Sequence, residues 1–487
     1  MVKIRESFTK SSGKTNRTRK CSTLKRTARS GALQLHHLPD DILRRILSRL
    51  TFRESSQMRL LSCKWQRLWR TCCSKVIFTR STMFQPGNTS IRRTRTNFVR
   101  RVNSILRQLC SPCNLTKFIV KFGLRRKHTC HVNRWVCFCA SSGARHITLD
   151  FTPGSKGNHM GFADDKYIFP LHVFGGPDNS FAHIKSLHLG YVCLNPATAS
   201  FACFSNLKKL TMHKVSFLGG HLCLQDFTAL EWLTISYCSL AGLTANQPLH
   251  CLWYLRLHYC YLSKIELEAP NLTTFALTNR PIPFALSDDS HKVVEASINL
   301  TCRGTTYGDN LDYIYTKLPA ALPHVQKLSV TSKIFIFDEL QGFAKTSTRF
   351  INLTHLTLSL PLCGDNQSIG GILRLAYLLE LAPALEELEL HFYWYGVSFG
   401  QTLRGDMVPY RHDKLKRVLM SGACSWVGLI ELAYYILRSA SKLECMIIDP
   451  VHRDQGPPAE GWMLNRGRQM TKRLLERDEF QSVLTIL

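Results

Sequence analysis

The sequence predicts an α/β protein in which a short cluster of helices precedes a long solenoid of parallel strands with helical or irregular return segments. Two observations support this fold class. Between Leu35 and Arg70, apolar residues recur at the three- and four-residue steps of a helix face. Farther along the 487-residue chain, short units with alternating apolar residues recur at intervals of 20 to 32 residues, as in repeat proteins.

The positive charge is concentrated in the first third of the chain. The net charge is +29, and residues 1–150 carry 33 Lys and Arg against five acidic residues, so the remainder is almost neutral. Residues 1–33 combine this charge with few apolar side chains, which predicts a basic disordered arm. The run from Arg17 to Arg29 leaves two interpretations open, a nuclear-import signal or a solvated flexible arm.

No stretch reaches the roughly 18–20 apolar residues of a membrane span, and the N-terminus lacks the apolar core of a signal peptide. We therefore expect no membrane partner, a location in the nucleus and/or cytoplasm, and reduced thiols for the 19 cysteines. One cluster of cysteine and histidine residues has the residue types of a zinc site, but small buried thiols explain it better, and we expect no metal and no cofactor. Its members are Cys110, Cys113, His128, Cys130, His131, Cys137 and Cys139.

The first helix is expected from Asp40 to Leu50, opened by a Leu-Pro pair and an acidic first turn. A second apolar set between Met58 and Trp69 predicts two further helices, so three helices share about 35 residues. Helices this short are marginal on their own. Part of their apolar face is therefore expected to meet a partner.

Residues 34–76 resemble the F-box. The resemblance lies in the Leu38-Pro39 start, the acidic pair, the Ile/Leu ladder and the tail Leu-Leu-Ser-Cys-Lys-x-Trp-x-x-Leu-Trp. It implies docking on a Skp-type adaptor and, through it, on a cullin-RING core. The implied adaptor-binding residues are Leu38, Pro39, Ile42, Leu43, Ile46, Leu47, Leu60, Leu61, Cys63, Trp65, Leu68 and Trp69.

Two positions depart from the F-box pattern. Thr51 stands where the family usually has proline, which predicts a less rigid turn after the first helix. Glu54-Ser55 replaces a common Asp-Leu pair, so one apolar contact is expected to be missing.

Residues 77–145 are expected to be a basic linker with capping helices. Apolar residues between Ile91 and Leu109 have helical spacing, and a second helix is expected from Val132 to Ala140. The first of these helices is expected to pack on the first repeat.

The repeat signal begins at His146. Homologous positions Leu187, Leu210, Leu233, Leu255 and Phe275 are 23, 23, 22 and 20 residues apart. Their pattern, L-x-x-L-x-L-x-x-C/N-x-L, is that of leucine-rich repeats, in which each unit supplies one parallel strand and a return segment. Because no unit buries its own core, neighbouring units must stack.

We divide the array at residue 300. Residues 146–300 hold short repeats, and residues 301–450 hold longer ones with helical returns, including helices at Ile369–Leu381 and Trp426–Ser439. The end of the second part resembles the FBD-type region of plant F-box/leucine-rich-repeat proteins. Residues 451–487 are expected to be a tail or a terminal helix.

In such a stack, residues flanking and between the leucines face the concave surface. This arrangement aligns aromatic, Arg and His side chains, which are frequent in binding hot spots, although exposed aromatics also stabilise neighbouring strands. The predicted target-binding residues are Lys209, His213, Trp232, Tyr254, Arg256 and His258.

The sequence contains no nucleophile elbow, zinc-protease motif or P-loop, so we expect no catalytic residue. The favoured function is a substrate-receptor subunit of a Skp-cullin-F-box type E3 ubiquitin ligase, with the repeats holding an unidentified target protein. The alternative is a nuclear nucleic-acid or chromatin-associated binding protein without ligase function. Against it, the basic residues are not interleaved with aromatics in an RNA-binding pattern, and nucleic acid is not the expected partner.

Overall fold

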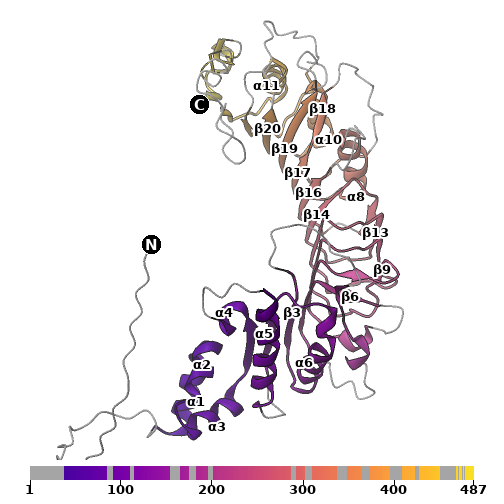
Figure 1. The fold of residues 1–487 in the computed structure, drawn as a ribbon. Helices are drawn as coiled ribbons and strands as arrows, with labels where there is room; N and C mark the ends of the chain where they lie inside the picture. Colours follow the sequence, from indigo (N-terminus) through magenta and orange to yellow (C-terminus); the bar gives the residue numbers. More distant parts are fainter. Residues whose placement is uncertain are drawn as a thin grey trace, which may run out of the picture.

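A computed structural model of the protein describes most of the chain. The described residues are 38–84, 91–109, 115–153, 165–174, 183–195, 201–286, 292–301, 310–336, 348–364, 372–394, 409–422, 427–449, 465, 468–469, 471–473, 475 and 478–487. A helical cluster stands at one end of a curved stack of strands (Figure 1). The predicted basic arm at residues 1–33 lies outside the described residues.

The helical cluster consists of α1 (Asp40–Arg49), α2 (Phe52–Met58) and α3 (Cys63–Cys72). The prediction of three short helices is confirmed. Acidic residues in the first turn of α1 and Arg49 in its last turn suit the helix dipole. The Ser62 hydroxyl caps α3 by accepting a hydrogen bond from the Trp65 N–H at 3.3 Å.

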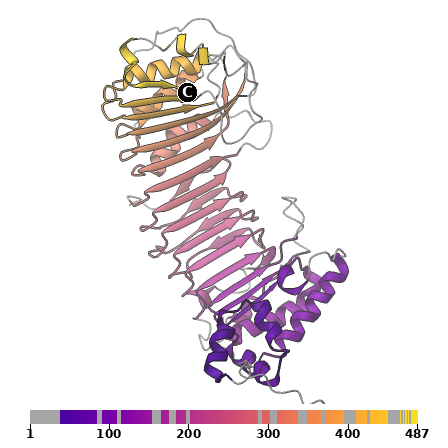
Figure 2. The same ribbon diagram turned by 90° about the vertical axis from the view of Figure 1, so that its left-hand side faces the viewer.

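The main sheet contains 16 strands in the described part of the chain, all paired in parallel. It lines the concave side of the arc and is seen face-on in Figure 2. In order, the strands are β1 (Lys75–Thr79), β2 (Lys117–Lys121), β3 (His146–Asp150), β5 (Ser186–Gly190), β7 (Lys209–His213), β10 (Trp232–Ser236), β12 (Tyr254–His258), β14 (Thr274–Asn279), β16 (Glu295–Leu300), β17 (Lys327–Ser332), β19 (His355–Gly364), β20 (Glu387–Trp394), β21 (Arg417–Ser421), β22 (Cys445–Asp449) and β23 (Leu484–Ile486), with β18 (Ile334–Ile336) paired to β19.

The strands follow the predicted leucine register. Leu187, Leu210, Leu233, Leu255 and Phe275 are direct neighbours across β5 to β14, and all five are buried. Because side chains alternate between the two faces of a strand, every second residue enters the core and the others reach the concave surface. The solenoid expected from the repeat spacing is therefore confirmed.

The return segments change in character along the array. Early return segments carry short strands that form two small sheets. One sheet consists of β4 (Tyr167–Ile168), β6 (Val192–Leu194) and β8 (Ser216–Phe217), and the other of β9 (His221–Cys223), β11 (Gly242–Thr244), β13 (Lys264–Glu266) and β15 (Phe284–Ala285). These returns also contain the short helical turns η4 (Leu171–Phe174) and η6 (Ala202–Phe204). Later returns are helical, as the wider spacing predicts. They are α7 (Asn310–Asp312), η7 (Tyr313–Lys317), α8 (Leu318–Ala321), η8 (Arg374–Ala376), α10 (Tyr377–Leu381) and α11 (Val427–Ser439).

The segment 77–145 is more than a linker with capping helices, and this expectation is wrong in part. The helices α5 (Ile91–Leu106) and α6 (Thr129–Ser141) exist, with α4 (Arg80–Met83) and η2 (Arg126–His128), but they alternate with β1 and β2 of the main sheet. The array thus begins at Lys75, immediately after the helical cluster.

The helical cluster and the array share one hydrophobic core, which runs from Leu43 through the strands to Phe480. The Phe52 ring of α2 meets the Phe78 ring of β1 edge-on, with ring centroids 5.5 Å apart. The F-box helices and the array therefore do not have separate cores, because β1 packs directly against α2.

The C-terminal segment also joins the fold. The strand β23 pairs with β22, following the short turn η9 (Asp478–Phe480), and Leu475 and Phe480 are buried. Residues 451–487 were expected to form a tail or a helix. The described residues 465, 468–469, 471–473 and 475 are helical, so the predicted helix is confirmed in part, and β23 adds a final strand to the sheet after it.

Candidate functional site

The start of α1 is held against α3 by charged side chains. The Lys64 ammonium donates to the Leu38 carbonyl at 2.9 Å and lies 3.3 Å from the Asp40 carboxylate. Arg67 contacts the same carboxylate at 3.3 Å. These contacts bring the Leu-Pro start of α1 to the N-terminal end of α3, near the turn that carries Leu60 and Leu61.

Five of the twelve predicted adaptor-binding residues are buried. They are Leu43, Leu47, Trp65, Leu68 and Trp69, and they form the core that joins the three helices to β1. A side chain without accessible surface makes no partner contact in this conformation. Their predicted direct contact with an adaptor is therefore corrected to a role in shaping the cluster.

The other seven reach the surface. Pro39, Ile42, Leu60, Leu61 and Cys63 are exposed, while Leu38 and Ile46 are half-buried. Leu60 and Leu61 are 77% and 63% exposed, the highest values of any large apolar side chain in the described part of the chain. This exposure agrees with the predicted contact surface, and adaptor binding through these residues remains a prediction.

Thr51 compensates for the missing proline. Its hydroxyl accepts a hydrogen bond from the Glu54 N–H at 3.3 Å, and its own N–H donates to the Glu54 carboxylate at 2.9 Å. This reciprocal pair is a capping box at the start of α2. The expected loss of rigidity is thus offset by hydrogen bonding.

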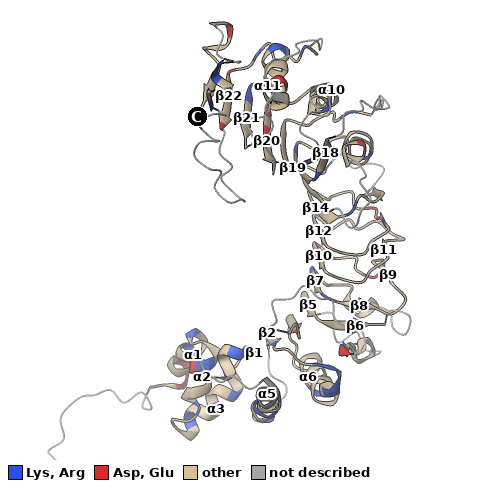
Figure 3. Ribbon diagram, turned by 45° about the horizontal axis from the view of Figure 1, so that its top comes forward, with Lys and Arg blue, Asp and Glu red and all other residues tan. Residues whose placement is uncertain are grey.

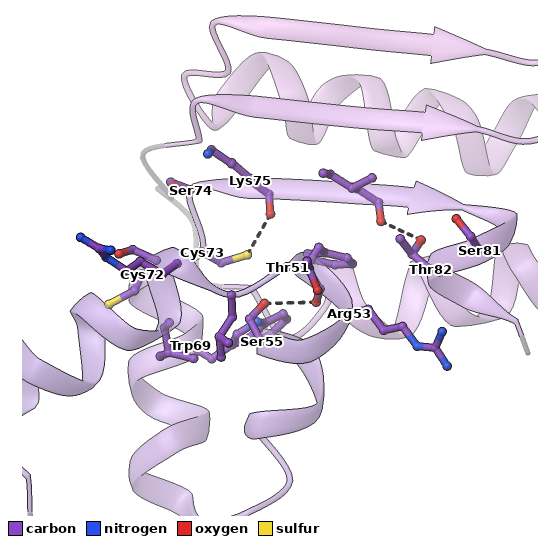
Figure 4. A pocket seen from close by; sticks show the side chains of 16 residues that line it. Thr51, Arg53, Ser55, Trp69, Cys72, Cys73, Ser74, Lys75, Ser81 and Thr82 are labelled. Atoms are coloured by element: carbon purple, nitrogen blue, oxygen red, sulfur yellow. Dashed lines mark hydrogen bonds between the residues drawn. The ribbon is translucent and has the colours of Figure 1, made fainter. Parts of the chain in front are cut away.

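A pocket of about 520 Å³ lies where the ends of α1 and α3 and the start of α2 meet β1 and α4 (Figure 4). Ser55, at the position where a leucine is common, lines it, in agreement with the apolar contact expected to be missing. Trp69 also lines it, and the Trp69 indole N–H has no hydrogen-bond partner among the described residues. The sequence carries no signal for this pocket, because its walls come from five separate elements.

The predicted target-binding residues lie in adjacent columns on the concave face. Lys209, Trp232 and Tyr254 are paired across β7, β10 and β12, and His213, Ser236 and His258 form a second column. Arg256 lies between the two columns and is exposed. The predicted register of these residues is confirmed, and their role in target binding remains a prediction.

The first column is a packed aromatic cluster. The Trp232 and Tyr254 rings stack with centroids 3.5 Å apart, and the Lys209 ammonium lies 4.2 Å from the Trp232 ring centre. The Trp232 indole N–H donates to the Thr234 hydroxyl at 2.9 Å, and Trp253 meets the Trp232 ring edge-on. Each contact limits the motion of these rings, so the cluster presents a preformed surface.

A second aromatic row follows the C-terminal ends of the strands. Tyr237 stacks on Tyr259 with centroids 5.2 Å apart and contacts His213 and His258 edge-on. Burial lowers the pKa of His213 and of His258, which favours neutral rings at pH 7. The positive charge of this region is therefore carried by Lys and Arg.

The described residues contain no group of three or more potential metal ligands, and Cys110 and Cys113 of the cysteine and histidine cluster lie outside them. No helix in the described part of the chain is long and apolar enough to cross a membrane.

Two family models match the chain. The leucine-rich-repeat domain of At1g61320/AtMIF1 matches residues 112–477, and the F-box domain matches residues 35–77. The predicted resemblance to F-box and leucine-rich-repeat proteins is confirmed.

Curated relatives come from Arabidopsis thaliana. The F-box/LRR-repeat protein At3g03360 is 24% identical over 73% of this chain and 70% of its own. The F-box/FBD/LRR-repeat protein At1g13570 is 23% identical over 72% of this chain and 74% of its own. The F-box/LRR-repeat protein At5g02910 is 25% identical over 73% and 71%.

Proposed function

We propose a function from one premise: the chain belongs to the At1g61320/AtMIF1 leucine-rich-repeat family and carries an F-box domain. On that premise, the protein is a substrate-receptor subunit of a Skp-cullin-F-box type E3 ubiquitin ligase. Its F-box docks a Skp-type adaptor, which connects it to a cullin-RING core, and its repeat array holds a target protein. The chain itself supplies no catalytic group, and ubiquitin transfer belongs to the charging enzyme held by the RING partner.

The exposed pair Leu60 and Leu61 carries the adaptor half of this proposal. Transferring an exposed leucine out of water is worth about 1.5–3 kcal/mol, so the pair offers a substantial driving force for docking. Ile42 and Pro39 add apolar surface on the neighbouring start of α1. The buried core of the three helices and β1 holds these exposed side chains in place before an adaptor binds.

The repeat array supports the second part of the proposal, the binding of a target protein. Its concave face holds the stacked rings of Trp232 and Tyr254 and the exposed Arg256, and Trp, Tyr and Arg are the residue types enriched in binding hot spots. The C-terminal units β21, α11 and β22 are the part of the chain that resembles an FBD-type region. The basic run at residues 17–29 supports a location in the nucleus and/or cytoplasm.

The test is adaptor capture by the full chain. We expect Leu60→Asp with Leu61→Asp to reduce co-purification of a Skp-type adaptor at least tenfold, because both charges would have to be buried in the interface. Circular dichroism should stay unchanged, since both side chains are exposed in the free protein.

Ile351→Asp is the matched control, because Ile351 is 55% exposed but lies before β19 in the array. It should leave adaptor capture unchanged. Full capture by the Leu60/Leu61 variant, or equal loss in the Ile351 variant, would argue against F-box docking through this surface.

A further inference from the structure

We propose that the target segment held by this protein is an extended acidic peptide lying across the concave face from β2 to β12. This inference rests on the proposed receptor function and specifies the partner of its target-binding half. It is carried by the charge and the aromatic packing of that part of the sheet.

Four cations, here called the basic face, project from the concave positions of β2, β7 and β12. They are Lys117, Lys121, Lys209 and Arg256, and all four are exposed. Within the part of the chain that the structure describes, none of the four forms an ion pair. Among the six neighbouring strands β2, β3, β5, β7, β10 and β12, the one carboxylate at a concave position is Asp150. Asp150 is the cross-strand neighbour of Lys121 and accepts the Thr152 N–H at 3.1 Å. With four cations and one carboxylate, the face carries a net positive charge and attracts acidic partners.

The far end of the same sheet is built differently. Glu387 of β20 pairs with His355 of β19 and with Arg417 of β21, and Lys416 pairs with Glu386. Charges at that end are neutralised by neighbouring strands. Figure 3 shows Lys and Arg prevailing over the N-terminal elements and mixed with Asp and Glu toward the C-terminal end. An acidic partner is thus directed to the N-terminal half of the concave face.

The aromatic rings favour a peptide over single-stranded nucleic acid. Tyr254 of β12 and Lys209 of β7 approach Trp232 from the strands on either side of β10, so they cover both faces of the Trp232 ring. Nucleobases bind such platforms by stacking on open ring faces. Stacking on Trp232 would first have to break these contacts, whereas a carboxylate can pair with Lys209 from the side.

The spacing of the cations sets the length of the peptide. Five strand-to-strand steps separate β2 from β12, which corresponds to about 24 Å at about 4.8 Å per step. An extended chain covers this span with about seven or eight residues. Carboxylates near both ends and the middle would reach Lys121, Arg256 and Lys209.

The experiment measures binding of labelled probes to the full chain by fluorescence anisotropy at about 0.15 M salt, where long-range attraction is screened. The probes are an octapeptide of alternating Glu and Ser, its Gln counterpart and an eight-nucleotide oligo-dT. We expect the Glu peptide to bind at least tenfold more tightly than the other two.

Two triple variants with the same change in net charge distinguish binding at the basic face from non-specific attraction to the net positive charge of the protein. Lys121→Glu, Lys209→Glu and Arg256→Glu should weaken the Glu peptide at least tenfold. Arg100→Glu, Arg126→Glu and Arg134→Glu change exposed cations on α5, η2 and α6 and should leave its affinity within twofold. Circular dichroism checks that both variants fold.

Equal weakening by both triple variants, or no binding of the Glu peptide, would overturn the proposal. Tighter binding of oligo-dT that depends on Lys121, Lys209 and Arg256 would assign the face to nucleic acid instead. Adaptor capture by the same proteins is measured in parallel. If the unmodified chain captures no adaptor, the receptor function is refuted. If it captures the adaptor but does not prefer the Glu peptide, only the present inference is refuted.

Discussion

Thr51 shows how one substitution in a family pattern can be compensated by hydrogen bonding. Proline at this position would restrict the backbone, whereas Thr51 instead caps α2 through Glu54. The backbone angles of Thr51, φ −63° and ψ 158°, are the ones an N-cap adopts. The hydrogen bonds from Thr51 also hold the pKa of the Glu54 carboxyl below its ordinary value.

We predict that Thr51→Ala destabilises the protein by about 1 kcal/mol at pH 7, because the first turn of α2 loses its side-chain cap. Thr51→Ser keeps the hydroxyl and should behave like the unmodified protein. Urea unfolding followed by tryptophan fluorescence measures both variants. Equal stability of all three proteins would show that the cap contributes nothing.

The pH dependence of the same pair has a defined sign. Because the pKa of Glu54 is lowered in the folded state, its contribution is present above the pKa of the unfolded chain and is lost as the pH falls through the folded pKa. The difference between Thr51→Ala and the unmodified protein should therefore shrink below about pH 4. A difference that stays constant down to pH 3 would contradict a role for the Glu54 carboxylate.

The helical spacing of the F-box stretch predicts which residues are apolar and structured but not which of them face solvent. Leu43 and Leu60 fit the same family pattern, yet the first is fully buried and the second is the most exposed large apolar residue described. The difference arises because β1 covers one side of the cluster, and this packing involves a strand outside the motif. Tertiary contact, which local periodicity does not encode, decides which of these side chains are available to the proposed adaptor surface.

Each of four consecutive main-sheet strands ends in the same turn. Tyr191, Lys214, Tyr237 and Tyr259 follow β5, β7, β10 and β12 with φ between 50° and 55°, in the left-handed region. Their N–H groups donate to the next strand, as from Tyr237 to the His258 carbonyl at 2.8 Å. Leucine spacing does not reveal this turn, because Tyr and Lys stand where Gly or Asn would signal it.

We predict that Tyr259→Val is less stable than Tyr259→Asn by about 1–2 kcal/mol. Both variants lose the Tyr237 stacking contact, but a β-branched residue is strained at positive φ whereas asparagine tolerates it. Urea unfolding of the two variants isolates this backbone effect. Equal stability would mean that the turn relaxes to negative φ without cost.

The register of the middle repeats could be predicted from the sequence, whereas the start of the array could not. Leu187 to Phe275 recur at nearly constant spacing because their returns are short. The first strands align Val76, Phe118, Ile147 and Leu187, which are 42, 29 and 40 residues apart. Helices α5 and α6 lie in two of these intervals, so the apolar residues do not recur at a constant spacing. The sequence pattern therefore does not predict that the array begins directly after the helical cluster.

A shared core implies that the F-box and the first strands unfold together. We predict that Phe52→Ala destabilises the protein by about 3–5 kcal/mol, because the buried ring fills the space between α2 and β1. Hydrogen exchange should show α1–α3 and β1–β3 losing protection at the same urea concentration, since removing Phe52 uncovers Phe78 as well.

Phe227→Ala is the matched control, because Phe227 is also buried but packs against Phe201 within the array. It should lower protection around β7 and β10 and leave α1–α3 protected, since repeat arrays pass destabilisation mainly to nearest neighbours. If Phe52→Ala exposed only α1–α3 while β1–β3 kept their protection, the F-box would be an independent domain. The Phe52–Phe78 contact predicts the opposite result, because it joins α2 directly to the first strand of the array. Such a joint would fix the orientation of the proposed adaptor surface relative to the proposed basic face.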